Sequence, residues 1–98
     1  MTTEYFASHI PYGKEKAVSR NFLSMLFGIS DREVRKMVQK SRNDGYIIIN
    51  DQNGGGYYQS DNIDDIARQY RQNRHRALSI LKSQKHLRKR LKEAGRIV

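Results

Sequence analysis

Side chains that can hydrogen-bond to nucleic-acid bases gather on one predicted helix, residues 31–44. Its apolar and small residues recur at helical spacing and define an inward face: Val34, Met37, Val38 and Ser41. Four polar residues then lie on the outward face: Arg32, Arg35, Lys36 and Gln39. Arginine can bind guanine through two hydrogen bonds, and glutamine can do the same with adenine. The pattern favours base recognition, although a solvated helix surface has a similar composition.

Capping residues define this helix and the one before it. Ser19 is a good N-cap for a helix over residues 20–27, and Gly28 is a typical helix end. Ser30 can cap the next helix, with Glu33 completing a capping box, and Gly45 ends it. The sequence thus predicts two helices joined by a short turn.

The remaining elements of the first 60 residues are expected to be short. Residues 3–9 can form a helix with Tyr5 and Phe6 facing inward, ahead of a turn at 10–13. Strands are expected at Ala17–Val18, Tyr46–Ile49 and Tyr57–Gln59, the last two joined as a hairpin by the turn over 50–56. Most of the hairpin tyrosines are expected in the core, with base stacking as the lesser alternative.

The spacing over residues 20–37 is typical of two crossing helices that share a core. With Arg20 as the first position, apolar residues occupy the fourth, eighth, tenth, fifteenth and eighteenth positions: Leu23, Phe27, Ile29, Val34 and Met37. Ser24 is small where the second helix passes closely. Gly28 suits a turn that needs a left-handed backbone.

Residues 10–59 resemble winged helix-turn-helix proteins. Ser30-Asp31-Arg32-Glu33-Val34-Arg35, followed by Asp44-Gly45-Tyr46-Ile47, resembles the recognition-helix signature of GntR- and MarR-type regulators. Gly55-Gly56-Tyr57-Tyr58 is similar to their wing return. The lead-in over 10–18 is similar to that of small winged-helix proteins of Gram-positive prophages. The expected fold is mainly α with a small β-hairpin: a winged helix-turn-helix domain over 1–60 and a basic helical extension over 61–98.

The resemblance implies sequence-specific binding of double-stranded DNA, with residues 31–44 in the major groove. Ser30 and Arg32 would approach phosphates or base edges, Arg35, Lys36 and Gln39 would face the groove, and Lys40 and Arg42 would flank the backbone. The wing has no basic residue between Asn50 and Gln59, so its contacts would be backbone N–H groups near Asn53, Gly54 and Gly55. A phage or prophage regulator of transcription or of replication and recombination is the function implied.

Net charge supports a polyanionic partner. The 98 residues carry 19 Lys and Arg against 10 Asp and Glu, for a net charge of +9. Residues 62–98 hold 11 of these basic residues and 3 of the acidic ones. This tail can track phosphates, or can simply be a solvated helix; its densest basic cluster is Lys85, Arg88, Lys89, Arg90 and Lys92.

Apolar residues recur along this tail every 3.5 residues, from Ile63 to Ala94. One continuous helix would be longer than the front domain can cover. Either the helix breaks near 82–84, or its apolar stripe meets a partner chain, with a homodimer as the natural candidate. Packing of the first turns on the front domain is the alternative.

Several function classes lack their residues. The chain has no cysteine, which excludes disulfides and thiol catalysis, and its three histidines are scattered. The glycine run precedes a strand and lacks the Lys-Ser/Thr of a phosphate loop. We expect no enzyme activity, no metal, no cofactor and no membrane span, and a cytoplasmic location. The alternatives to DNA regulation are a protein-interaction module on the same fold, directed at a host or phage replication or defence protein, and RNA or single-strand binding by the tail.

Overall fold

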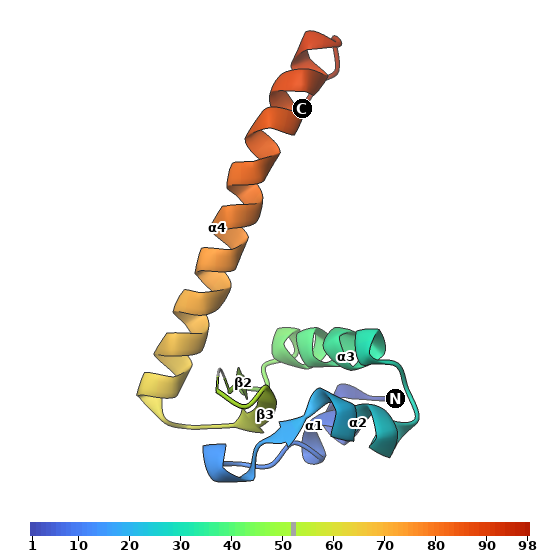
Figure 1. Ribbon diagram of the computed structural model, residues 1–98, viewed down its shortest axis with the longest axis vertical. Coiled ribbons are helices and arrows are strands. Elements are labelled where there is room, and N and C mark those ends of the chain that lie inside the picture. The colour runs from blue at the N-terminus through green and yellow to red at the C-terminus, as the bar shows by residue number, and fades with distance from the viewer. Residues whose placement is uncertain (52) are drawn as a thin grey trace. The chain divides into compact units, whose positions relative to one another are not determined.

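The computed structural model describes residues 1–51 and 53–98, which divide into two compact units, Met1–Ile66 and Ala67–Val98. The element order is α1 (Thr3–Ser8), η1 (Lys14–Lys16, a 3-10 turn), β1 (Val18–Ser19), α2 (Arg20–Phe27), α3 (Asp31–Asn43), β2 (Ile48–Asn50), β3 (Gly56–Gln59) and α4 (Ile63–Glu93). The expectation of a mainly helical chain with a small antiparallel sheet and a long C-terminal helix is confirmed (Figure 1).

The predicted caps form. The Ser19 hydroxyl accepts a hydrogen bond from the Phe22 N–H at 3.0 Å, and that of Ser30 accepts one from the Glu33 N–H at 3.1 Å. Gly28 ends α2 in the left-handed conformation, with φ 65°. Each cap satisfies a backbone N–H that the helix itself leaves without a partner, which fixes where α2 and α3 begin.

Strand β3 is the centre of a three-stranded antiparallel sheet of order β1-β3-β2. Its last residue, Gln59, is buried and joins the sheet to the segment after α1. The Gln59 side-chain amide donates to the carbonyls of Ala7 and Ile10, at 2.9 and 3.0 Å. Its backbone N–H donates to the Pro11 carbonyl at 2.8 Å. One residue therefore fixes the sheet against α1.

Helix α3 packs on both α1 and α2 and closes the core of Met1–Ile66 (Figure 1). The core cluster draws on all of these helices and on the sheet: Phe6, Ile10, Leu23, Val34, Val38, Ile48 and Tyr57. Five half-buried residues pack around it: Val18, Phe27, Ile29, Met37 and Tyr46. The residues whose spacing predicted a shared core for α2 and α3 are thus in contact with one cluster.

Some local predictions were wrong. Tyr5 is 55% exposed, because the short α1 turns only Phe6 and Ala7 into the core. The strand expected at Tyr46–Ile49 begins two residues late, because the Tyr46 N–H donates to the Ser41 carbonyl and closes the end of α3. Ala17 lies outside β1, since its N–H closes η1 on the Lys14 carbonyl.

Smaller differences concern the ends of elements. Helix α3 ends at Asn43, with Asp44 as its C-cap, and α1 ends at Ser8. Strand β2 extends to Asn50 and β3 begins at Gly56, which shortens the predicted hairpin turn by one residue at each end. Gln52 of that turn lies outside the described residues.

Helix α4 is a single helix of 31 residues, which answers the question that the sequence left open at 82–84. Asn62 caps its start by accepting from the N–H groups of Asp64 and Asp65, at 2.9 and 3.2 Å. Among the described residues, no helix has the length and apolar content that a membrane crossing requires.

Candidate nucleic-acid interface

Helix α3 has one buried and one exposed face. Val34 and Ser41 are fully buried and Val38 is 3% exposed. The polar residues predicted to face outward are all exposed, namely Arg32, Arg35, Lys36 and Gln39, and so is Lys40. Because the buried face is fixed by the core, the opposite face is held in one orientation. A rigid row of hydrogen-bond donors at about 1.5 Å rise per residue results.

The turn before α3 sets how that helix is presented. The backbone N–H groups of Gly28 and Ile29 both donate to the Ser24 carbonyl, and the Ser24 hydroxyl donates in turn to the Ile29 carbonyl. A side chain larger than serine would lose this return bond and crowd the approach of α3. The small residue predicted at this position is therefore part of the turn.

The N-terminus of α3 carries a network of three charges. The Asp31 carboxylate lies 2.9 Å from Arg20 Nε and 3.0 Å from an Arg35 terminal nitrogen. Hydrogen bonding to the Tyr57 side chain, and then the charge of Asp31, raise the pKa of Arg20, so its guanidinium stays charged. The sequence analysis placed Arg20 only as the start of a spacing pattern. Its position beside Asp31 links the start of α2 to the start of α3.

Two further predicted site residues, besides Ser30 and Arg35, have partners within the chain. The Gln39 amide donates to the Asn43 side chain at 3.0 Å, a bond between exposed groups that another acceptor can replace. Arg42 is half-buried, and its Nε donates to the Ile48 carbonyl at 3.0 Å, which ties α3 to β2. The geometry thus gives Arg42 a place in the α3–β2 junction, away from the exposed row.

The β2–β3 turn is organised by its acidic residue. The Asp51 carboxylate accepts from the Asn53 N–H at 3.0 Å, and the Asp51 carbonyl accepts from the Gly55 N–H at 2.9 Å. Asn53, Gly54 and Gly55 are exposed. The Asp51 charge is therefore used to shape the turn, and the glycines leave its backbone accessible.

The basic residues predicted in the tail are all on α4 and exposed: Lys85, Arg88, Lys89, Arg90 and Lys92. Arg90 lies 3.5 Å from Glu93 in an exposed pair, which is worth little in water. Ala67–Val98 carries 11 Lys and Arg and one acidic residue, for +10, whereas Met1–Ile66 carries 8 and 9, for −1. The net positive charge of the chain therefore comes entirely from the second unit.

An apolar patch on α2 was not anticipated as a surface. Phe22, Met25 and Leu26 are 49%, 76% and 48% exposed, while Leu23 of the same helix is buried. The presence of five apolar residues on one short helix was the available signal, because a single helix face cannot bury them all. Within residues 1–51 and 53–98, no three His, Asp or Glu side chains come close enough to hold a metal ion.

Comparison with known proteins assigns no relatives. No family model matches the chain, and neither a curated protein nor a solved structure shows significant similarity to it.

Proposed function

We propose that Met1–Ile66 is a winged helix-turn-helix domain and that the chain binds double-stranded DNA with α3 in the major groove. The observation that carries the proposal is the exposed row Arg32, Arg35, Lys36 and Gln39 on a helix whose opposite face is locked in the core. A capped helix presented in this way, after a tight turn and before an antiparallel hairpin, matches how such domains enter DNA.

The residues in that row divide by chemistry. Arg32 and Arg35 can make paired hydrogen bonds to guanine, and Gln39 can do so with adenine once it leaves Asn43. Lys36 and Lys40 are point charges suited to phosphates. The Ser30 hydroxyl, which already caps α3, can still donate its proton to a phosphate oxygen at the same helix start.

The two units would make separate contributions. Since Met1–Ile66 has a net charge of −1, it supplies sequence choice more than attraction. The +10 of Ala67–Val98 supplies affinity that is independent of sequence, through release of counterions from phosphates. The resulting protein would act in the bacterial cytoplasm as a small regulator of prophage type. It would have no catalytic activity and would work by occupying its site on DNA.

The test is selection from random duplex pools, followed by titration at several salt concentrations. An Arg35→Ala/Lys36→Ala variant should lose the enriched motif, at about 1–3 kcal/mol for each base contact. The matched control is Lys14→Ala/Lys16→Ala, which removes the same charge from exposed positions of η1. Enrichment of no motif, or equal losses in both variants, would contradict recognition by α3.

A second function is favoured by the α2 patch and by the charge of the first unit. Phe22, Met25 and Leu26 form an apolar surface outside the α3 row, and a net charge of −1 is unusual for a DNA reader. A protein-interaction module on this fold would use that patch. Met25→Asp would then abolish capture of the partner while DNA binding stays unchanged. A preference for single-stranded competitors would instead assign the tail to RNA or single-strand binding.

A further inference from the structure

Helix α4 exposes a regular apolar seam. From Tyr70 onward, seven exposed residues alternate at spacings of three and four: Tyr70, Asn73, Ala77, Ile80, Gln84, Leu87 and Leu91. Tyr70 and Leu87 are 62% and 63% exposed, and Ile80 is 54% exposed. A strict repeat of 3.5 residues is the pattern of a helix that supercoils around another helix.

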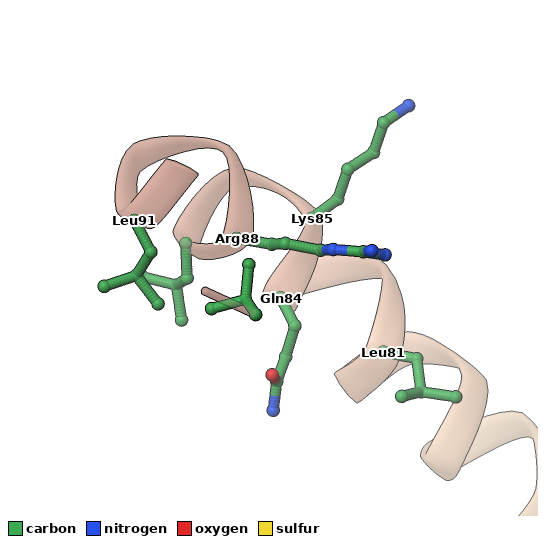
Figure 2. A pocket seen from close by; sticks show the side chains of 7 residues that line it. Leu81, Gln84, Lys85, Arg88 and Leu91 are labelled. Atoms are coloured by element: carbon green, nitrogen blue, oxygen red, sulfur yellow. The ribbon is translucent and has the colours of Figure 1, made fainter. Parts of the chain in front are cut away.

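A hollow interrupts this seam near its C-terminal end. Gly95, with φ 78°, turns the chain back, and the Arg96 N–H donates to the Leu91 carbonyl at 2.9 Å. Val98 is thereby placed beside the seam residues Gln84, Leu87 and Leu91, which line the hollow with it. Figure 2 shows Gln84 between Leu81 and Leu91, with the Lys85 side chain pointing away from them. The hollow is apolar on the seam side and cationic at its rim.

We infer that α4 pairs with α4 of a second copy of this chain as an antiparallel coiled coil, with Tyr70 of the second copy seated in this hollow. The centre of the pairing lies between Leu78 and Ser79. Each Tyr70 is then level with Leu87 of the other copy. This self-association surface does not depend on DNA binding.

Matching of the layers selects the antiparallel register. In that register Asn73 is level with Gln84 of the second copy, so the two polar seam residues meet each other. Ala77 is level with Ile80, which pairs a small side chain with a large one. A parallel pairing would oppose Ala77 to Ala77 and leave a gap, and would oppose the larger Ile80 to Ile80 in the next layer.

Charge along α4 selects the same orientation. The first turn of the helix is acidic at Asp64 and Asp65, and its last turn is basic at Arg90 and Lys92. Residues 82–92 contain six Lys or Arg, which a parallel pair would bring against the same six. The antiparallel pair instead places these six residues beside 65–75 of the other helix, which hold three Arg and one Asp, so fewer like charges meet. Arg74 and Arg76, which flank the seam, are level with Ser83 and Leu81, respectively.

The mass of the full chain in solution tests the association. Light scattering or sedimentation equilibrium, from low micromolar to near-millimolar concentration, should show conversion to twice the mass of one chain. Tyr70→Ala and Ile80→Asp should each lose the dimer, whereas Tyr70→Phe should keep it. Ser79→Asp, an exposed change on the opposite face of α4, is the matched control. A wild-type chain that stays monomeric throughout would overturn the inference.

Disulfide trapping tests the orientation, since the chain has no cysteine of its own. Asn73→Cys and Gln84→Cys variants are oxidised each alone and also as a mixture. Cross-linking is expected only in the mixture. In the antiparallel register two copies of residue 84 are 11 residues apart along the axis, or about 17 Å. A disulfide tolerates Cα separations of only about 7 Å. Cross-linking of the Gln84→Cys variant with itself would overturn the antiparallel pairing.

Discussion

Met1–Ile66 and Ala67–Val98 differ in how far their apolar side chains are buried. Every buried apolar side chain of the described residues lies in the first unit, and the second contributes only Gln69 to the buried set. Helix α4 satisfies its own backbone hydrogen bonds but leaves large apolar residues such as Leu81 and Leu87 in water. Since most helix stability in proteins comes from packing of an apolar face, the second unit lacks the packing that stabilises the first.

The same two units differ in charge, −1 against +10. The first unit has a packed core and the second a highly charged surface, and these properties suit different tasks. The first can position side chains to within the tolerance of a hydrogen bond, and the second can attract a polyanion at long range. Under the proposed function, this division would let the specificity and the affinity for DNA be altered independently.

The largest expected effect contrasts a core leucine with a seam leucine. Leu23→Ala should lower the free energy of unfolding of the first unit by about 2–5 kcal/mol, because it leaves a cavity in the core. Leu87→Ala should leave that unfolding transition in place and weaken only self-association. Urea titration followed by near-ultraviolet circular dichroism measures the unfolding of both variants. Equal destabilisation by the two changes would contradict the contrast between the units.

The next effect concerns Gln59, whose side chain donates two hydrogen bonds to carbonyls about 50 residues away in the sequence. Gln59→Leu should cost about 1–3 kcal/mol, because it leaves the Ile10 carbonyl without its donor, whereas the Ala7 carbonyl keeps its bond from the Ile10 N–H. The same urea titration applies. Gln72→Leu on α4 is the matched control and should change the unfolding free energy of the first unit very little.

A matched pair of glycines gives a smaller effect. Gly28 and Gly95 both have positive φ, 65° and 78°, and an added Cβ at either would meet nothing within 4 Å. Gly28→Ala should therefore cost backbone strain alone, about 1–2 kcal/mol, in the unfolding of the first unit. Gly95→Ala should only release the last turn of α4 and its return segment. A lowered urea midpoint for Gly95→Ala would show that the units unfold together.

The smallest effect on stability is expected at Asp31. Because its ion pairs with Arg20 and Arg35 are exposed, Asp31→Asn should change the unfolding free energy by no more than about 1 kcal/mol. The same change releases two guanidinium groups and removes a negative charge from the start of α3, so DNA affinity should rise a few-fold. Glu33→Gln, two residues further along the first turn of α3, controls for the loss of negative charge alone. A fall in affinity would show that Asp31 is needed to orient Arg35.

Salt separates the two units most simply. DNA binding by the +10 unit should weaken as salt rises, because release of the same counterions into more concentrated salt gains less entropy. Dimerisation through α4 should strengthen, because salt screens repulsion between two basic helices. Parallel titrations of DNA affinity and solution mass measure the two slopes. Slopes of the same sign would indicate that one surface serves both.

A structural feature could be predicted from the sequence when the interactions that cause it join residues close together along the chain. Ser19, Gly28 and Ser30 fix helix ends through bonds that span only a few residues, so their positions were predictable. Tyr5 was misplaced because the depth of a short helix depends on Phe27 and His9, whose rings it contacts edge-on. For the candidate site, the exposed row of α3 followed from periodicity, but the bond from Arg42 to Ile48 did not.

The sequence alone determined the helical periods, the caps, the turn at Gly28 and the concentration of charge in the tail, because each is set by neighbours along the chain. Only the tertiary structure decided that Gln59 bridges the sheet to α1, that Asp31 joins Arg20 to Arg35, and that α4 continues unbroken with its seam exposed. These features depend on which distant groups meet in space. Hydrogen bonds and ion pairs act over a few ångströms, so a pattern along the chain gives no distance between residues 7 and 59 or 20 and 31.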